Sequence, residues 1–241
     1  MIRSVIGLVS LLLAVAACAA EKPEAAPEKG PDGSLILFNG KDLKGWDGDP
    51  KFWSVRDGAI TGATTPENVT PSNTFLIWRG GTLKDFELNL KFRIKGGNSG
   101  IQYRSKDLGN WVVSGYQADF EDGETFTGIV YEERGRGVLA NVGEKTTVGA
   151  EGKPRKTGTV GEVKTIQALH RRGEWNDYRI TARGNHLVHA INGTVTAEST
   201  DEDEARRAME GILALQLHQG PPMVVQFKDI RLKVLDGKSG R

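Results

Sequence analysis

Alternation of apolar and polar residues, in short runs bounded by glycine, is the feature that most constrains how this chain folds. The clearest run is Phe86 to Ile94, where five apolar residues alternate with four polar ones. Successive side chains of a β-strand point to opposite faces, so this pattern indicates a strand with one buried face. About a dozen such runs follow one another, separated by turn dipeptides such as Asp57-Gly58 and Asn192-Gly193. We therefore expect an all-β fold, a jelly-roll sandwich of two antiparallel sheets.

Two local departures from this pattern carry predictions of their own. Thr200–Met209 is the one stretch that favours a short helix, with Thr200 as its N-cap. The last run, Met223–Leu235, changes its apolar phase between Phe227 and Ile230, which predicts a β-bulge near residues 228–229.

The N-terminus has the pattern of an export signal. Arg3 precedes an apolar run from Val5 to Val15 that is too short to span a bilayer and is followed by small and polar residues. The sequence Val15-Ala16-Ala17-Cys18 is similar to the bacterial lipobox, whose cysteine is lipidated. We expect residues 1–18 to be a signal peptide with a lipobox, and Cys18 to anchor the chain to a membrane facing the periplasm or exterior. The alternative is cleavage after Ala19 or Ala20, which would release a soluble periplasmic or secreted protein.

Composition sets the domain organisation and excludes several functions. Residues 19–33 mix proline, alanine and charge, which predicts a flexible linker; residues 34–235 suit one domain, and 236–241 form a tail. Cys18 is the single cysteine, so the mature domain has no disulfide, no thiol nucleophile and no cysteine-ligated zinc. The balance of 32 basic and 31 acidic residues argues against a nucleic-acid partner.

Three alternating runs place polar side chains on one face of a predicted strand. These side chains are Gln102 and Arg104; Gln117, Asp119 and Glu121; and Gln216 and His218. If the strands are neighbours, one face holds a base, an acid, a cation and amides, which suits the binding of a sugar and the transfer of its protons. Tyr103, Trp111 and Tyr131 are candidate contacts for the sugar ring. An ordinary solvated sheet face explains the periodicity equally well.

Candidate roles follow from side-chain chemistry. His218 can accept and return a proton at neutral pH, because the ordinary pKa of imidazole is about 6.5. Asp119, Glu121 and Asp122 are candidate oxygen ligands for a divalent metal ion, although their spacing matches no known loop motif. No other cofactor motif is present.

Several motifs together resemble one bacterial family. They include Asn98-Ser99-Gly100-Ile101, Gly115-Tyr116-Gln117, Gly173-Glu174-Trp175-Asn176, Leu215-Gln216-Leu217-His218 and Val225-Gln226-Phe227-Lys228-Asp229. Between about Ser34 and Leu235 the chain resembles the 3-keto-disaccharide hydrolases, also described as 3-keto-glucoside 1,2-lyases and 3-keto-2-hydroxy-glucal hydratases. The resemblance implies a concanavalin A-like jelly roll and an exported carbohydrate-active enzyme. Many family members have Glu where this chain has Gln117.

The chemistry implied by the resemblance is β-elimination next to a ketone. A ketone at C3 acidifies the C2 proton, so a base can remove it while the C1 oxygen leaves, and water can then add back. We expect His218 or Asp119 to act as base, Glu121 as the second proton-transfer group, and Arg104 or a metal ion to stabilise the enolate. Gln102, Gln117 and Gln216 would hold hydroxyls.

Two other functions remain open at this stage. The same fold serves lectins, so a non-catalytic carbohydrate-binding module is the main alternative, and a surface scaffold is a third. Saturable sugar binding without product formation would indicate the binding module, whereas a scaffold would show neither binding nor turnover.

Overall fold

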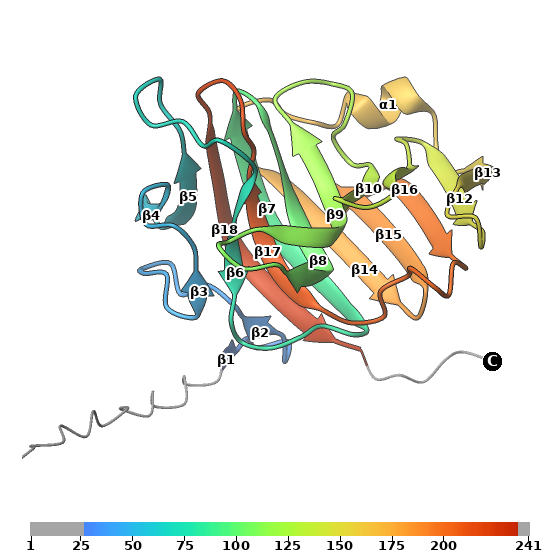
Figure 1. The fold of residues 1–241 in the computed structure, drawn as a ribbon, viewed down its shortest axis with the longest axis horizontal. Coiled ribbons are helices and arrows are strands. Elements are labelled where there is room, and N and C mark those ends of the chain that lie inside the picture. The colour runs from blue at the N-terminus through green and yellow to red at the C-terminus, as the bar shows by residue number, and fades with distance from the viewer. Residues whose placement is uncertain (1–26, 236–241) are drawn as a thin grey trace, which may run out of the picture.

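The computed structural model describes residues 27–235, which fold into two packed β-sheets (Figure 1). The larger, 11-stranded sheet has the order β1-β2-β18-β7-β14-β15-β16-β12-β13, with β5 beside β18 and β4 beside β5; the 7-stranded sheet has the order β11-β10-β9-β8-β17-β6-β3. The bounds are β1 Glu28–Lys29, β2 Leu35–Ile36, β3 Trp46–Asp47, β4 Trp53–Arg56, β5 Ala59–Ala63, β6 Thr74–Trp78, β7 Phe86–Lys95, β8 Asn98–Asp107, β9 Val113–Glu121, β10 Val130–Glu133, β11 Gly137–Ala140, β12 Glu144–Val148, β13 Pro154–Thr159, α1 Val163–Gln167, β14 Asn176–Arg183, β15 His186–Ile191, β16 Thr194–Asp201, β17 Ile212–Leu217 and β18 Val224–Val234. The predicted all-β sandwich is confirmed.

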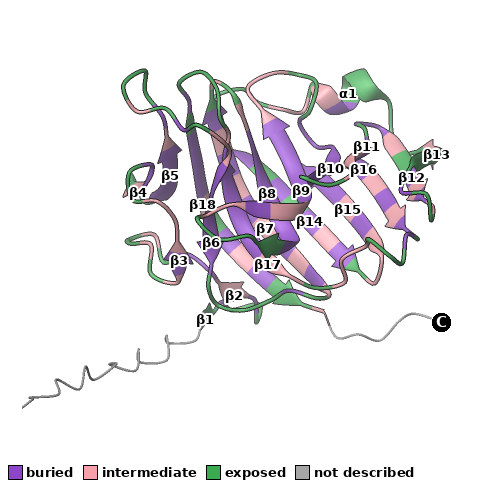
Figure 2. Ribbon diagram, in the orientation of Figure 1, coloured by how far each residue is buried: buried purple, intermediate pink, exposed green. Residues whose placement is uncertain are grey.

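The apolar core lies between the two sheets. Every second residue of β7 is buried, from Phe86 to Ile94, as the alternation predicts. Phe92 packs against Phe120 of the smaller sheet, with ring centroids 4.1 Å apart, and Phe227 packs against the ring of Phe120 as well. Figure 2 shows the resulting band of buried residues through the central strands. Burial of each such side chain contributes about 1.5–3 kcal/mol.

The predicted turns and bulge are confirmed. Asp57, with φ of 52°, and Gly58 close the β4–β5 hairpin, since both turn positions need positive φ. The pairing of β18 with β7 shifts register between Lys228 and Arg231, where Asp229 has φ of 54°. The bulge moves the apolar residues of β18 back to the core face.

The predicted helix at residues 200–209 is wrong. Thr200 and Asp201 end strand β16, and turns follow. Asp201 is fully buried and accepts hydrogen bonds from Arg136, so a long-range ion pair, which sequence periodicity does not reveal, fixes the chain there. The single helix among the described residues is α1, capped by the side chain of Glu162.

The described part of the predicted linker includes a short strand. Within residues 19–33, Glu28 and Lys29 form β1, which pairs with Ile36 and Leu35. The predicted signal peptide, the linker up to residue 26 and the tail 236–241 lie outside the described residues. No helix in the part described is long and apolar enough to cross a membrane.

Candidate functional site

The three polar runs lie on adjacent strands. β8 pairs with β9 and with β17, and Gln102 stands directly opposite both Gln117 and Ala214. β10 adds a fourth strand beside β9. On the outer face of this smaller sheet lies a cavity of about 350 Å³, which we call the polar hollow. It is lined by Asn73, Asn98, Gln117, Asp119, Glu121, Phe126, Ile129, Tyr131, Glu133, Val138, Gln216 and His218. Its volume is within the range of roughly 300–1,000 Å³ that is typical of small-molecule sites.

Asp119 is the most perturbed group in the polar hollow. Its side chain is 6% exposed, and burial raises the pKa of its carboxyl to about 8. Hydrogen bonds from Asn98 and Gln117 oppose that shift, whereas the nearby carboxylates of Glu121 and Glu133 add to it. At neutral pH Asp119 is therefore mostly protonated, and a buried carboxylic acid of this kind can donate a proton.

A directed line of hydrogen bonds ends at Asp119. Ser105 Oγ donates to Gln102 Oε1 at 2.7 Å, Gln102 Nε2 to Gln117 Oε1 at 2.6 Å, and Gln117 Nε2 to Asp119 Oδ2 at 2.9 Å. Gly100 leaves room for this arrangement, because a Cβ there would lie 2.4 Å from Gln117. Because Gln117 presents its NH₂ group, it cannot accept the acid proton of Asp119, which remains available to the polar hollow.

A second polar group lies beside Asp119. Glu133 Oε1 accepts a hydrogen bond from Asn73 at 3.1 Å, and Oε2 accepts one from Gln216 at 3.4 Å. Gln216 is fully buried, and its Oε1 has no hydrogen-bond partner among the described residues. Buried polar atoms are almost always paired, so this oxygen is suited to accept a hydroxyl of a bound molecule.

His218 and Tyr131 complete the lining. His218 Nδ1 donates to the carbonyl of Gln219, and in that tautomer Nε2 keeps its lone pair. The Tyr131 hydroxyl makes no hydrogen bond within residues 27–235. Burial and the charges of Glu133 and Asp119 raise its pKa, so it stays a neutral donor. His218 and Asp119, both predicted as site residues, line the same cavity.

Arg104 does not reach the polar hollow, contrary to the alternation in the sequence. β8 has a bulge between Tyr103 and Lys106, where Arg104 has φ of 46° and its side chain turns off the outer face. The guanidinium donates to the carbonyls of Lys84 and Gly184 and to Asp85. Arg104 therefore connects the segment before β7 with the turn between β14 and β15.

Two predicted sugar contacts also lie elsewhere. Tyr103 points into the core, where its hydroxyl is 2.9 Å from His189 Nε2. Trp111 is in the loop after β8 and donates to Asp47 at 2.8 Å. Gln102 is fully buried behind Gln117, so it supports the lining without being part of it.

The three predicted metal ligands do not form a common site. Both oxygens of Asp119 accept amide hydrogen bonds, Asp122 accepts the backbone N–H of Gly96, and one oxygen of Glu121 accepts those of Thr125 and Phe126. In the described part of the chain, no group of three or more His, Cys, Asp or Glu is placed to hold a metal ion. Glu121, predicted as a proton-transfer residue, lines the polar hollow but also fixes the loop at its rim.

Several lining residues were absent from the sequence prediction. Glu133 carried a usable signal, since it lies two residues after Tyr131 and therefore shares its face of β10. Asn73, Phe126 and Val138 come from outside the three runs, and nothing local in the sequence connects them with the site.

Comparison with known proteins identifies the family of this chain. Residues 33–233 match the profile of the 3-keto-alpha-glucoside-1,2-lyase-like domain. The chain belongs to this family. A 3-keto-disaccharide hydrolase from Bacteroides thetaiotaomicron is 24% identical over 85% of this chain and 79% of its own length.

Solved structures support the fold. A protein from Parabacteroides distasonis, provisionally named a glycosyl hydrolase, superposes with a TM-score of 0.56 at 18% identity, covering 84% of this chain and 99% of that one. The carbohydrate-binding module CBM66 from Bacillus subtilis gives a TM-score of 0.53 at 12% identity, covering 80% of this chain and 98% of that one. The chain is a carbohydrate-active protein of the glycosyl hydrolase type with a concanavalin A-like jelly roll.

Proposed function

We propose that the chain cleaves 3-keto-glucosides by β-elimination of the C1 substituent, followed by addition of water. The observation that carries the proposal is Asp119, a buried carboxyl with a pKa of about 8 in the polar hollow of a chain from the 3-keto-alpha-glucoside-1,2-lyase-like family. Elimination requires an acid for the departing oxygen, a base for the C2 proton and a donor to the enolate.

The lining residues suit these three roles. His218 Nε2 takes the C2 proton, the electron pair forms the C1–C2 double bond, and the C1–O bond breaks as Asp119 protonates the departing oxygen. Tyr131 donates to the C3 oxygen, where negative charge develops. Gln216 Oε1 accepts a sugar hydroxyl. Addition of water across the double bond then places hydroxyl at C1 and a proton at C2, which is net hydrolysis.

Export and lipid anchoring of Cys18 are part of the proposal. Mass spectrometry of the membrane fraction would detect a thioether-linked lipid on Cys18, and its absence with an N-terminus at Ala20 or Glu21 would contradict anchoring.

The decisive assay measures release of the aglycone from an aryl 3-keto-glucoside by residues 19–241, which include the whole core. Asp119→Asn and His218→Ala are each expected to lower kcat by about 10²–10⁴, the usual contribution of one acid or base. Asp177→Asn, on the outer face of the larger sheet, is the control and is expected to keep full activity. Saturable binding of the 3-keto-glucoside without product would instead support a carbohydrate-binding module.

A further inference from the structure

The outer face of the larger sheet carries an excess of positive charge. The outward positions of three adjacent strands, β18, β7 and β14, hold eight basic residues, which we call the basic face: Lys91, Arg93, Lys95, Arg179, Arg183, Lys228, Arg231 and Lys233. The same strands present only three carboxylates outward: Glu87, Asp177 and Asp229. The whole chain has a formal net charge of +1, so the molecule separates its charges in space.

Strand register brings these cations close together. Lys228 stands directly opposite Lys91, and Arg231 and Arg179 flank Asn89 in one row across three strands. Like charges in directly opposite positions destabilise a sheet. Within residues 27–235, Lys91 is the single member of the basic face with an ion pair, to Asp177. Trp175 lies under Arg93 and Lys228 and offsets part of this repulsion. The remaining excess of positive charge favours a role in binding negative charge.

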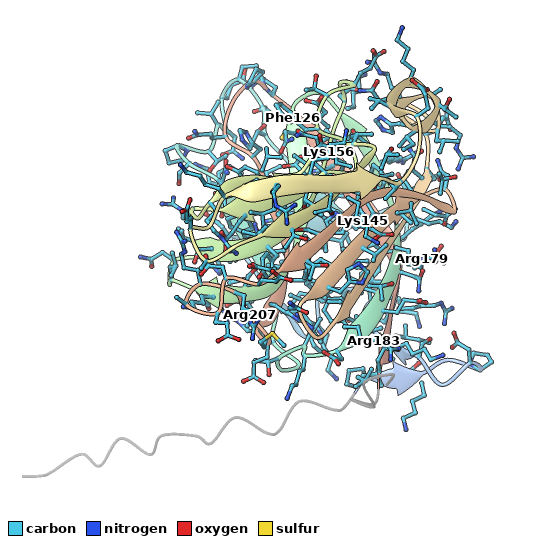
Figure 3. All side chains as sticks on the ribbon, turned by 90° about the vertical axis from the view of Figure 1, so that its right-hand side faces the viewer. Phe126, Lys145, Lys156, Arg179, Arg183 and Arg207 are labelled. Atoms are coloured by element: carbon cyan, nitrogen blue, oxygen red, sulfur yellow. The ribbon has the colours of Figure 1, made fainter. Side chains whose placement is uncertain are left out.

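The basic face and the polar hollow lie on opposite sides of the sandwich, because each is the outer face of a different sheet. Figure 3 shows Arg179 and Arg183 on strands of the larger sheet. The chain enters the fold at this sheet, since Ile36 of β2 pairs with Arg231. Eight residues lie between Cys18 and Pro27, so the two positions are at most about 32 Å apart. A lipid on Cys18 would therefore keep the basic face near the membrane.

We propose that the basic face docks on the anionic phospholipid surface to which the N-terminus is tethered, and thereby holds the polar hollow on the side away from the membrane. The partner is identified by charge complementarity and by the short tether, which ends at the edge strand β1 of the sheet that carries the basic face. Each cation close to an anionic leaflet strengthens binding about fivefold. The inference rests on the proposed lipid anchoring of Cys18 and is independent of the reaction that the polar hollow catalyses.

The test uses residues 19–241, which lack Cys18 and its lipid, so that any binding to vesicles comes from the folded domain and not from a lipid anchor. Co-sedimentation with phosphatidylcholine vesicles is compared with and without phosphatidylglycerol. We expect binding only to the anionic vesicles, falling as salt rises from about 0.01 M to 0.15 M and the Debye length shrinks from about 30 to 8 Å. The triple variant Arg179→Glu, Arg183→Glu, Arg231→Glu is expected to weaken this binding by more than about 100-fold, because three cations are lost and three anions are added.

A matched control separates the face from overall charge. Lys41→Glu, Lys106→Glu, Arg134→Glu makes the same change in net charge at exposed positions outside the basic face and is expected to leave vesicle binding within about twofold. If circular dichroism shows that the first triple variant is unfolded, the triple variant Arg179→Gln, Arg183→Gln, Arg231→Gln replaces it, with roughly a 100-fold loss expected from three cations at about fivefold each. Equal binding to neutral vesicles, equal loss in the control, or binding to a polyanionic polysaccharide without binding to vesicles would overturn the proposal.

Discussion

The protonation of Asp119 makes a thermodynamic prediction that needs no substrate. The folded chain holds this carboxyl with a pKa of about 8, against 3.8 as its ordinary value. Between these values the folded state binds a proton that the unfolded state has released, so folding stability falls as pH rises from about 4 to 8. Each pH unit in this window is worth about 1.4 kcal/mol. From pH 5 to pH 8 the expected loss is on the order of 4 kcal/mol.

Comparison with Asp119→Asn isolates this effect from other titrating groups. The groups facing Asp119 are Glu121 on its own strand, Glu133 and Tyr131 on β10, and His218 after β17, and all four remain in the variant. Asparagine does not titrate. Its NH₂ group replaces one of the two oxygens that accept hydrogen bonds from Asn98 and Gln117, so two N–H donors then face each other. This mismatch lowers the unfolding free energy by about 1–3 kcal/mol at every pH.

Urea unfolding of both proteins at pH 5, 6.5 and 8 gives the difference in unfolding free energy. The wild type is expected to be the more stable at pH 5, and its advantage is expected to disappear or reverse by pH 8. A difference that stays constant over this range would mean that Asp119 is ionised in the folded chain, and the role of proton donor would have to be abandoned.

Three further perturbations test the support around the site. Arg136→Ala leaves the buried carboxylates of Glu132 and Asp201 without their ion pair, while Asp203 keeps Arg206. The change is expected to cost about 3–5 kcal/mol in denaturant unfolding, with little rescue by Lys; a loss below about 1 kcal/mol would contradict it. Burial lowers the pKa of His189 to about 4, so the stability that neutral His189 provides is lost as pH falls from about 6.5 to 4, on the order of 3 kcal/mol. Thermal melts of His189→Gln should therefore show a smaller fall of the melting temperature over this pH range than the wild type. Gln102→Leu removes the N–H donor that orients the side-chain amide of Gln117, which in turn donates to Asp119. We expect kcat to fall about tenfold with little change in KM, and an unchanged kcat would refute the positioning role of Gln102.

Periodicity in the sequence was sufficient for most of the fold. The side-chain period of a strand is two, so the alternation in Phe86–Ile94 and the phase change before Ile230 each identified a local backbone feature that the structure contains. The helix prediction at 200–209 failed because Asp201 is held by Arg136 from another part of the chain. Long-range ion pairs of this kind leave no local pattern.

The site was predicted less completely than the fold, for a related reason. The three alternating runs were expected to be neighbouring strands with their polar side chains on one face, and Asp119 and His218 line one cavity. Asn73 and Phe126 reach it from loops whose paths depend on the assembled sandwich. Periodicity placed Glu121 on the same face as Asp119, but its Oε1 accepts hydrogen bonds from the backbone N–H groups of Thr125 and Phe126 in the loop at the rim.

The bulge in β8 explains the failed prediction for Arg104 and keeps a cation off the face that carries Asp119. Uninterrupted alternation would have put the guanidinium of Arg104 on the same face as Gln102, in the strand paired with that of Asp119. A positive charge on this face would lower the pKa of Asp119 and favour its ionised form, more strongly the closer the guanidinium came. The bulge instead sends Arg104 to the carbonyls of Lys84 and Gly184, and Ser105, a neutral hydroxyl, takes its place on the face. With no cation among the residues that line the polar hollow, burial sets the pKa of Asp119, and the group remains an acid at neutral pH.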